Sequence, residues 1–199
     1  MIEIVNASFK ISASSLQNSP NSALSEVVFL GRSNVGKSSF INKILQKNSL
    51  AKTANTPGKT RLINYFDAKF KIDENSYANL YFVDLPGYGY AKVSKKMANE
   101  WQKNLDEFLK SRPNIRVFVH LRDSRQFDMK LDLDVNNYIK SFLKNDQVLL
   151  NFYTKSDKIN QSEKSAVLRF DKNAFFISSL KNQGINEARD LIVKKALGL

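Results

Sequence analysis

Short apolar runs alternate with amphipathic stretches along most of the chain, and this alternation predicts the secondary structure. The runs that predict strands are 26–30, 61–70, 80–83, 115–121, 148–153 and 174–177. Apolar residues spaced three and four apart predict helices around 40–45, 97–109, 135–143 and 185–197. With one more helix between the last two strands, the predicted order is βαββαβαβαβα.

This order predicts an α/β fold of three layers. Because crossovers between parallel strands are right-handed, the helices should cover both faces of one mostly parallel, six-stranded sheet. The length of 199 residues suits one domain. We expect a domain at 26–199, and an N-terminal segment at 1–25 that packs on it or leads into it. The Ser- and Asn-rich stretch 12–25 is the part expected to be loose.

Ligands of such sheets bind where the strands end, and the first predicted strand ends in a phosphate-binding motif. Residues 31–38 read GRSNVGKS, which matches G-x-x-x-x-G-K-[ST] between a strand and a helix. Glycines let backbone N–H groups and a helix N-terminus converge on phosphate, Lys37 adds positive charge, and the Ser38 hydroxyl can bind Mg²⁺. A glycine turn with an incidental lysine is the weaker interpretation.

Polar residues follow three more of the predicted strands. After 80–83 come Asp84 to Gly87, DLPG, where a carboxylate can hold Mg²⁺ through water and a glycine N–H can meet a terminal phosphate. After 148–153 comes TKSD, and the Asp157 carboxylate can pair with the two adjacent donors of guanine, which adenine lacks. After the last strand, backbone N–H groups of residues 177–179 could reach the base oxygen. Taken singly, each of these segments could also be an ordinary surface turn.

Composition narrows the class of protein. The chain has no cysteine and one histidine, His120, which excludes disulfides, thiolate metal sites and multi-histidine metal centres. No apolar run is long enough for a membrane helix. The net charge is +12, and residues 31–71 hold nine basic residues and one acidic residue. Such an excess favours an anionic partner such as nucleic acid, although a solvated lysine-rich face is the alternative. We expect a cytoplasmic monomer without a membrane partner.

A long polar loop, residues 53–61, lies between the first predicted helix and the second strand. It contains Pro-Gly and is placed to cover a bound phosphate. Thr56 or Thr60 could complete the coordination of Mg²⁺, and the spacing from residues 31–38 does not choose between them.

Five segments together resemble one protein family: GRSNVGKSS, TPGKTRLINYF, FVDLPGYGYAKVSK, TKSD and ISSLKNQG. They are similar to the EngB (YsxC/YihA) branch of bacterial Ras-like GTPases, from about Phe9 to Ile192. The resemblance implies the Ras-like P-loop NTPase fold and a GTP-binding protein that assists maturation of the large ribosomal subunit, with cell-division and septation defects on its loss. It also implies that the Mg²⁺-binding threonine is Thr60. The expected nucleotide-binding residues are Gly31, Arg32, Ser33, Asn34, Val35, Gly36, Lys37, Ser38, Gly58, Lys59, Thr60, Arg61, Leu62, Asp84, Leu85, Pro86, Gly87, Thr154, Lys155, Ser156, Asp157, Ile177, Ser178 and Ser179, with Ser38 and Thr60 as metal ligands.

The sequence differs from the wider G-protein pattern at two positions, and each difference leads to a prediction. Thr154 stands where N-K-x-D begins with asparagine, so threonine must supply the structural hydrogen bonds. Tyr88 follows Gly87 where many Ras-like enzymes have a water-orienting glutamine, which predicts weak intrinsic hydrolysis. Asn34 occupies the position at which several glutamine-lacking relatives hold K⁺ against the phosphates. The alternative functions are a P-loop kinase and an RNA-binding assembly factor that uses GTP as an ordering ligand.

Overall fold

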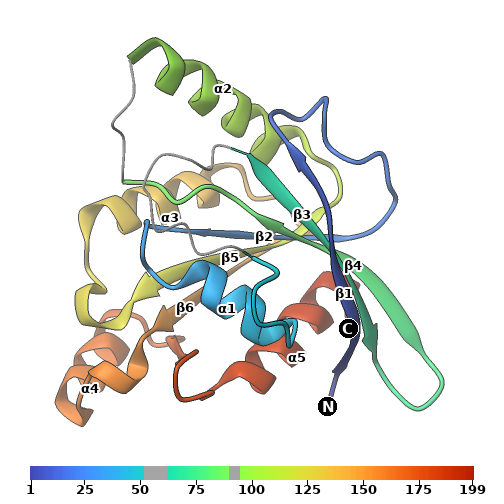
Figure 1. Ribbon diagram of the computed structural model, residues 1–199. Helices are drawn as coiled ribbons and strands as arrows, with labels where there is room; N and C mark the ends of the chain where they lie inside the picture. Colours follow the sequence, from blue (N-terminus) through green and yellow to red (C-terminus); the bar gives the residue numbers. More distant parts are fainter. Residues whose placement is uncertain (52–61, 90–94) are drawn as a thin grey trace.

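The computed structural model describes residues 1–51, 62–89 and 95–199 as one sheet with helices on both faces (Figure 1). The strands are β1 (Glu3–Ala13), β2 (Glu26–Gly31), β3 (Ile63–Lys71), β4 (Tyr77–Asp84), β5 (Ile115–Asp123), β6 (Val148–Thr154) and β7 (Phe175–Phe176). The helices are α1 (Lys37–Ile44), α2 (Lys95–Ser111), α3 (Lys130–Phe142), α4 (Gln161–Phe170) and α5 (Ile185–Leu197). Two 3₁₀ turns, η1 (Ser124–Gln126) and η2 (Ser156–Lys158), follow β5 and β6. The predicted α/β class and the predicted order from β2 to α5 are confirmed.

The sheet has seven strands in the order β1-β3-β4-β2-β5-β6-β7, so the predicted number of six is wrong. β1 pairs antiparallel with β3, and β3 pairs antiparallel with β4, whereas the other neighbours are parallel. The missed strand lies at the edge, and its side chains are mostly exposed. Backbone pairing with β3 holds it there, so the hydrophobic alternation that marks a half-buried strand is weak.

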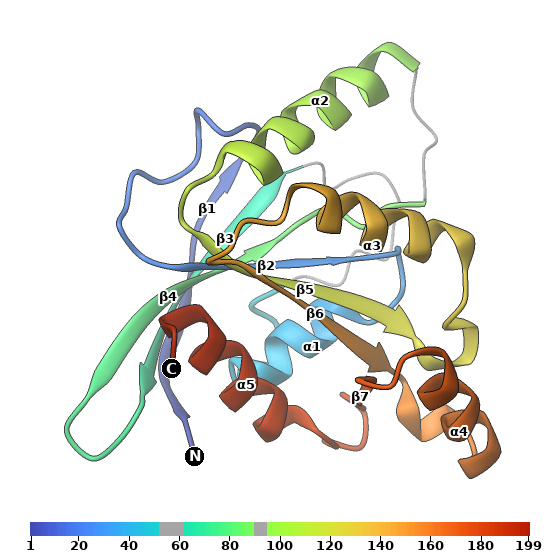
Figure 2. The ribbon, with the colours of Figure 1, turned by 180° about the vertical axis from the view of Figure 1, so that it is seen from behind.

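Alternate residues of the central strands feed two separate cores. Val27 and Phe29 of β2 face one side with apolar residues of α1 and α5, whereas Val28 and Leu30 face the other side with those of α2 and α3. Figure 2 shows the same two layers from behind, with α1 and α5 on one face of the sheet and α2 and α3 on the other. This arrangement brings the carboxyl ends of the parallel strands to one edge, where the motifs lie.

The N-terminus is tied to the last helix. The backbone N–H of Ile2 donates to the Asp190 carboxylate of α5 at 2.8 Å, and the Ile2 side chain is buried. Within the described part of the chain, no helix is both long and apolar enough to cross a membrane.

Candidate nucleotide-binding site

The turn between β2 and α1 has the backbone geometry of a phosphate loop. Gly36, directly before α1, has a φ of 102°, a conformation that side-chain-bearing residues rarely adopt. Gly31 is required for space, because a Cβ there would lie 2.8 Å from Cγ1 of Val35. Asn34, at the tip, also has a positive φ of 64°. The glycines therefore give the tight backbone turn directly before the N-terminus of α1 that a phosphate loop requires.

The lysine of this loop forms an ion pair with the carboxylate at the end of β4. Lys37 and Asp84 are both nearly buried, and Lys37 Nζ contacts Oδ1 of Asp84. The hydroxyl of Ser38 follows on the first turn of α1 and is partly exposed. Two of the predicted metal-associated groups and the phosphate-binding lysine thus belong to neighbouring segments at one edge of the sheet.

The segment after Asp84 packs directly on the phosphate loop. The N–H of Ser33 donates to the Tyr88 carbonyl at 3.0 Å, and the Tyr88 N–H donates to the Gly31 carbonyl at 3.3 Å. A Cβ at Gly87 would lie 3.0 Å from the Cα and N atoms of Ser33, so only glycine fits without displacing this backbone. Gly87 therefore lies directly against the phosphate loop, whereas the expected contact of its N–H with a terminal phosphate stays a prediction.

The Tyr88 side chain points to α3 and β5, which the sequence did not reveal. Its hydroxyl donates to Oδ1 of Asp132 at 2.7 Å and lies 2.6 Å from Nε2 of His120. Because the single phenol hydrogen goes to the carboxylate, Nε2 of His120 carries the hydrogen donated to the phenol oxygen. Arg32 completes the network, with Nε 3.0 Å from Oδ2 of Asp132. Nothing in the sequence indicated that Tyr88, His120 and Asp132 would meet. They lie in three separate segments with no motif in common.

Burial of this network raises the pKa of Tyr88, and the nearby Asp132 carboxylate raises it further. Burial likewise lowers the pKa of His120 to about 3, helped by the positive charge of Arg122. The phenol is therefore neutral and the imidazole uncharged at neutral pH.

Thr154 and Lys155 join the end of β6 to the phosphate loop. The Thr154 hydroxyl donates to the Val35 carbonyl at 2.7 Å, which is the structural bond expected of the residue in the asparagine position. Lys155 has a φ of 58°, and its Nζ donates to the Asn34 carbonyl at 2.8 Å and to Asp123 at 2.9 Å. The two residues fix the distance between the phosphate loop and the segment that carries Asp157.

Asp123, at the end of β5, is a site residue that the sequence analysis missed. Its carboxylate accepts hydrogen bonds from Arg125 at 2.7 and 2.9 Å and from Lys155. Burial alone would raise the pKa of Asp123, but these hydrogen bonds outweigh it and hold the pKa well below its usual range. Its place at the carboxyl end of a central strand was the available signal, because β5 ends at the same edge as the four segments that were considered.

Asp157 lies in η2, directly after the residues that contact the phosphate loop. The Ser178 hydroxyl donates to its Oδ1 at 2.5 Å, and this bond lowers the pKa of Asp157, with smaller contributions from Lys158 and Lys181. The carboxylate is therefore ionised, as pairing with the two donors of guanine requires.

The segment after β7 supports Asp157 in a different way from the expected one. The N–H of Ile177 donates to the Tyr153 carbonyl, and that of Ser178 donates to the Gln183 carbonyl. Within the described residues, the Ser179 N–H is the one of the three that has no backbone acceptor, so it alone remains available to a base oxygen. The contribution of Ser178 is its side chain. The N–H of Ser156 also turns inward, donating to the Ile177 carbonyl at 3.1 Å.

Most of the residues predicted to bind nucleotide from the long polar loop lie outside the described residues. Thr56, Gly58, Lys59, Thr60 and Arg61 belong to 52–61, and Leu62, at the edge of that range, is 40% exposed. Leu85 is buried and Pro86 is partly exposed beside Gly87.

Comparison with known proteins agrees with this geometry. Residues 26–155 match the family described as "50S ribosome-binding GTPase". A probable GTP-binding protein EngB of Campylobacter lari is 49% identical over 195 residues, 98% of this chain and 98% of the relative. That of Aliarcobacter butzleri is 48% identical, with the same coverage of both chains. This chain belongs to the EngB family of GTP-binding proteins.

Solved structures show the same fold at lower identity. The crystal structure of a probable GTP-binding protein EngB has a TM-score of 0.64 at 20% identity, covering 88% of this chain and 100% of that one. The structure of Era with MgGDPNP and nucleotides 1506–1542 of 16S ribosomal RNA has a TM-score of 0.65 at 22% identity, covering 86% of this chain and 56% of that one. As an EngB family member the chain is a GTPase that binds guanine nucleotide in a P-loop fold.

Proposed function

We propose that this EngB family member is a slow GTPase switch that acts in assembly of the large ribosomal subunit and is needed for normal cell division and septation. One observation carries the nucleotide part: Thr154 and Lys155 bond to the phosphate loop and so hold the ionised Asp157 at a fixed position beside it. The family description, "50S ribosome-binding GTPase", supports the ribosomal part. The proposed unit is a single domain overall, with the GTP-binding part at 26–199 and the N-terminal segment 1–25 packed on it through β1, and it works as a cytoplasmic monomer.

Slow hydrolysis follows from the position of Tyr88. The residue that many Ras-like enzymes use to orient water is here a tyrosine whose hydroxyl is bonded to Asp132 and His120, away from the phosphate loop. Orientation of water must then come from another group or from a partner. We propose large-subunit particles as that partner.

The residues present fit a magnesium ion bound together with the nucleotide. The Ser38 hydroxyl and the Asp84 carboxylate are oxygen ligands of the kind Mg²⁺ prefers, and Lys37 joins them at the same edge. In this proposal Ser38 and Thr60 bind the metal, Asp84 reaches it through water, and Lys37 moves from Asp84 to the phosphates. The metal supplies charge neutralisation at the phosphoryl group.

A potassium ion beside Asn34 is a second proposed contribution to hydrolysis. The Asn34 side chain is exposed at the tip of the phosphate loop, while its carbonyl is held by Lys155. The hydrogen bond from Lys155 uses the Asn34 backbone carbonyl and not its side-chain amide. We expect K⁺ to stimulate turnover and Asn34→Ala to abolish the stimulation with little loss of GTP affinity.

The partner proposal rests on charge and on a structural neighbour. The net charge is +12, and the similar protein Era was crystallised with 16S ribosomal RNA. An anionic particle built on RNA suits this charge.

One experiment separates the proposal from its alternatives: phosphate release from GTP under multiple turnover, with and without large-subunit particles, in K⁺ or Na⁺ at equal ionic strength. We expect slow release by the protein alone and faster release with particles. A kinase would transfer the phosphoryl group to an acceptor. An RNA-binding factor that uses GTP only as an ordering ligand would bind particles with no gain in turnover. Lys37→Ala is the control, since it should remove both basal and stimulated release.

A further inference from the structure

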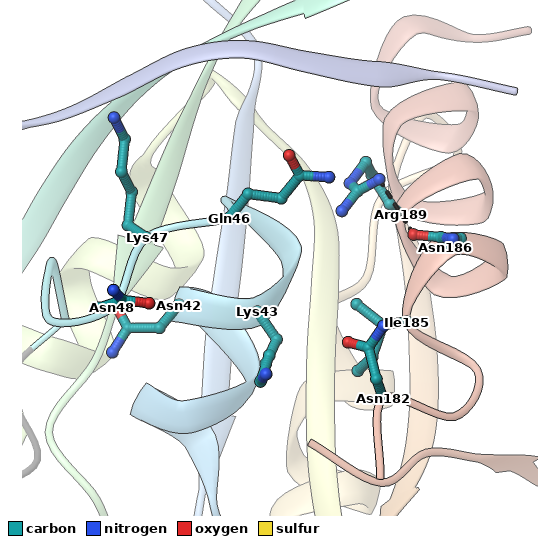
Figure 3. A pocket seen from close by; sticks show the side chains of 9 residues that line it. All are labelled: Asn42, Lys43, Gln46, Lys47, Asn48, Asn182, Ile185, Asn186 and Arg189. Carbon is teal, nitrogen blue, oxygen red and sulfur yellow. Dashed lines mark hydrogen bonds between the residues drawn. The ribbon is translucent and has the colours of Figure 1, made fainter. Parts of the chain in front are cut away.

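A polar cavity of about 260 Å³ lies between the end of α1 and the start of α5. In Figure 3, Gln46 and Lys43 on the α1 side lie opposite Arg189, Ile185 and Asn182 on the α5 side, whereas Lys47, Asn42 and Asn48 lie farther from α5. Since α1 begins at the phosphate loop and has eight residues, its far end is about 12 Å away, so the cavity is separate from the nucleotide site. The lining residues are Asn42, Lys43, Gln46, Lys47, Asn48, Asn182, Ile185, Asn186 and Arg189.

The charges that line this α1–α5 cavity are all positive. Lys43, Lys47 and Arg189 contribute three cations, and no carboxylate is among the lining residues. Arg189 is only 3% exposed, and none of the ion pairs within the described residues includes it. Burial lowers the pKa of Arg189, and the nearby carboxylates of Asp190 and Glu3 offset only part of this effect. A buried cation without a bonded counter-ion is costly, so an anion in the cavity would be stabilised.

Hydrogen-bond donors remain for such an anion. Arg189 donates from Nε to the Ile44 carbonyl at 2.9 Å and from Nη1 to Asn186 at 3.2 Å, which uses two of the five N–H groups of a guanidinium. By contrast, Asn42 is committed to the backbone, since its side-chain amide makes two bonds with Ala51. Gln46 extends toward Arg189 in Figure 3 and adds an amide from the opposite wall.

The size and lining suit one phosphate group of a polymer. The volume is below the roughly 300–1,000 Å³ of cavities that enclose a whole small-molecule ligand. Ile185 is the one apolar residue of the lining, and no aromatic side chain is present on which a base could stack. The site can therefore bind a phosphate but has nothing to read a base. The exposed Lys43 and Lys47 at its mouth can contact a chain that continues past it.

We propose that the α1–α5 cavity binds a backbone phosphate of RNA, held by Arg189 and by the two lysines of α1 and the loop after it. This proposal rests on the proposed function in one respect, the choice of RNA as the partner. Binding is independent of base sequence, because the contacts are to the phosphate.

The test measures binding of a short fluorescent single-stranded RNA to the GDP-loaded full chain by anisotropy, over about 50–200 mM KCl. The double variant Lys43→Gln/Lys47→Gln should weaken binding about five- to tenfold and reduce the slope of log K against log salt by about 0.7, the loss of one phosphate contact. Both lysines are exposed, so the variant should fold. Its GDP affinity, measured in the same samples, should equal that of the unchanged chain.

The matched control is Lys140→Gln/Lys144→Gln. These lysines are also exposed and four residues apart, but they lie on α3 and just after it, on the other face of the sheet. An equal loss in both double variants, or no loss in the first, would overturn the proposal in favour of general electrostatic attraction.

Inorganic phosphate distinguishes a free anion from RNA. It should displace RNA from the unchanged chain better than chloride does at equal ionic strength, and should lose this advantage in Lys43→Gln/Lys47→Gln. If phosphate stabilises the unchanged chain through these lysines while RNA binding is unaffected by them, the site takes a free anion and the RNA assignment is wrong. If particles do not stimulate turnover of the unchanged chain although its RNA binding still depends on the two lysines, the proposed function fails and this proposal stands.

Discussion

The Asp157 carboxylate is held in place by a neighbouring side chain. The Ser178 hydroxyl bonds to its carboxylate, lowers its pKa and holds its orientation, so the two residues act as one recognition unit. The serine was expected to act through its backbone, and that N–H is occupied by Gln183.

Asp157→Asn should lose selectivity for guanine and shift preference toward xanthine, whose 2-oxo group can accept from the new amide. Titration with GDP and XDP measures the change. Ser178→Ala is the matched control: it keeps the carboxylate and should weaken GDP binding without creating affinity for XDP. A variant Asp157→Asn that binds GDP normally and ignores XDP would show that another residue recognises the base.

His120 makes stability depend on pH. Its pKa is about 3 in the folded protein against the ordinary 6.5, because burial and Arg122 disfavour the charged form. Between these two pH values the unfolded chain binds more protons than the folded protein. The contribution of His120 to the free energy of unfolding is therefore fully present above about pH 6.5 and is lost as the pH drops.

We expect a loss of about 1 kcal/mol between about pH 7 and pH 5.5, measured by urea unfolding. His120→Gln should remove this loss, since glutamine does not titrate. Carboxylates with lowered pKa, such as Asp123, lose their contribution only below about pH 4 and do not interfere. The same loss in the glutamine variant would mean that another group titrates.

The start of β2 is fastened by a buried ion pair. The Glu26 carboxylate is fully buried and accepts from Nη2 of Arg112 at 2.6 Å and from its Nε at 3.0 Å. Burial raises the pKa of Glu26 more than Arg112 lowers it. The same guanidinium donates to the Pro20 carbonyl at 2.6 Å, which ties the segment before β2 to the end of α2.

Arg112→Met should cost about 3–5 kcal/mol of unfolding free energy, because it leaves a carboxylate buried without a partner. The double variant Glu26→Leu/Arg112→Met should lose less than Arg112→Met alone. Arg116→Met, which breaks the exposed pair with Asp146, is the control and should cost less than about 1 kcal/mol. Urea unfolding of the three variants measures the differences, and equal costs for the two arginines would contradict the argument.

Elements were predictable where burial follows a period. The central strands and helices α1, α2, α3 and α5 bury one or both faces, and their hydrophobic spacing records this. Helix α4 buries only Val167, and it was expected from the alternation of strands and helices, without a spacing of its own. β1 was missed because it is an edge strand with most side chains in solvent, and its pairing partner β3 lies fifty residues or more along the chain. Backbone pairing at an exposed edge does not require the alternation of buried and exposed side chains that marks a central strand.

The proposed metal site depends on residues far apart in the chain: Ser38 on α1, Asp84 at the end of β4 and, from the family resemblance, Thr60, which lies outside the described residues. Ser38→Ala should weaken Mg²⁺-dependent binding of both GTP and GDP. Thr60→Ala should weaken Mg²⁺-dependent binding of GTP alone, because we expect Thr60 to reach the metal only when a γ-phosphate orders its loop. Titration with each nucleotide, with and without Mg²⁺, measures the effects. Thr56→Ala is the control. If this variant instead loses Mg²⁺-dependent GTP binding selectively, Thr56 and not Thr60 is the metal ligand.

The sequence alone determined the phosphate loop, the Asp84 and Asp157 positions, the α/β class and the family resemblance. Each of these depends on adjacent residues or on a hydrophobic period, and both are local properties of the chain. The tertiary structure decided which distant side chains meet: Thr154 on the Val35 carbonyl, Tyr88 between His120 and Asp132, and Arg189 at the α1–α5 cavity. These contacts depend on strand order and register, which position a donor of one segment within about 3 Å of an acceptor on another. No spacing along the chain encodes that distance.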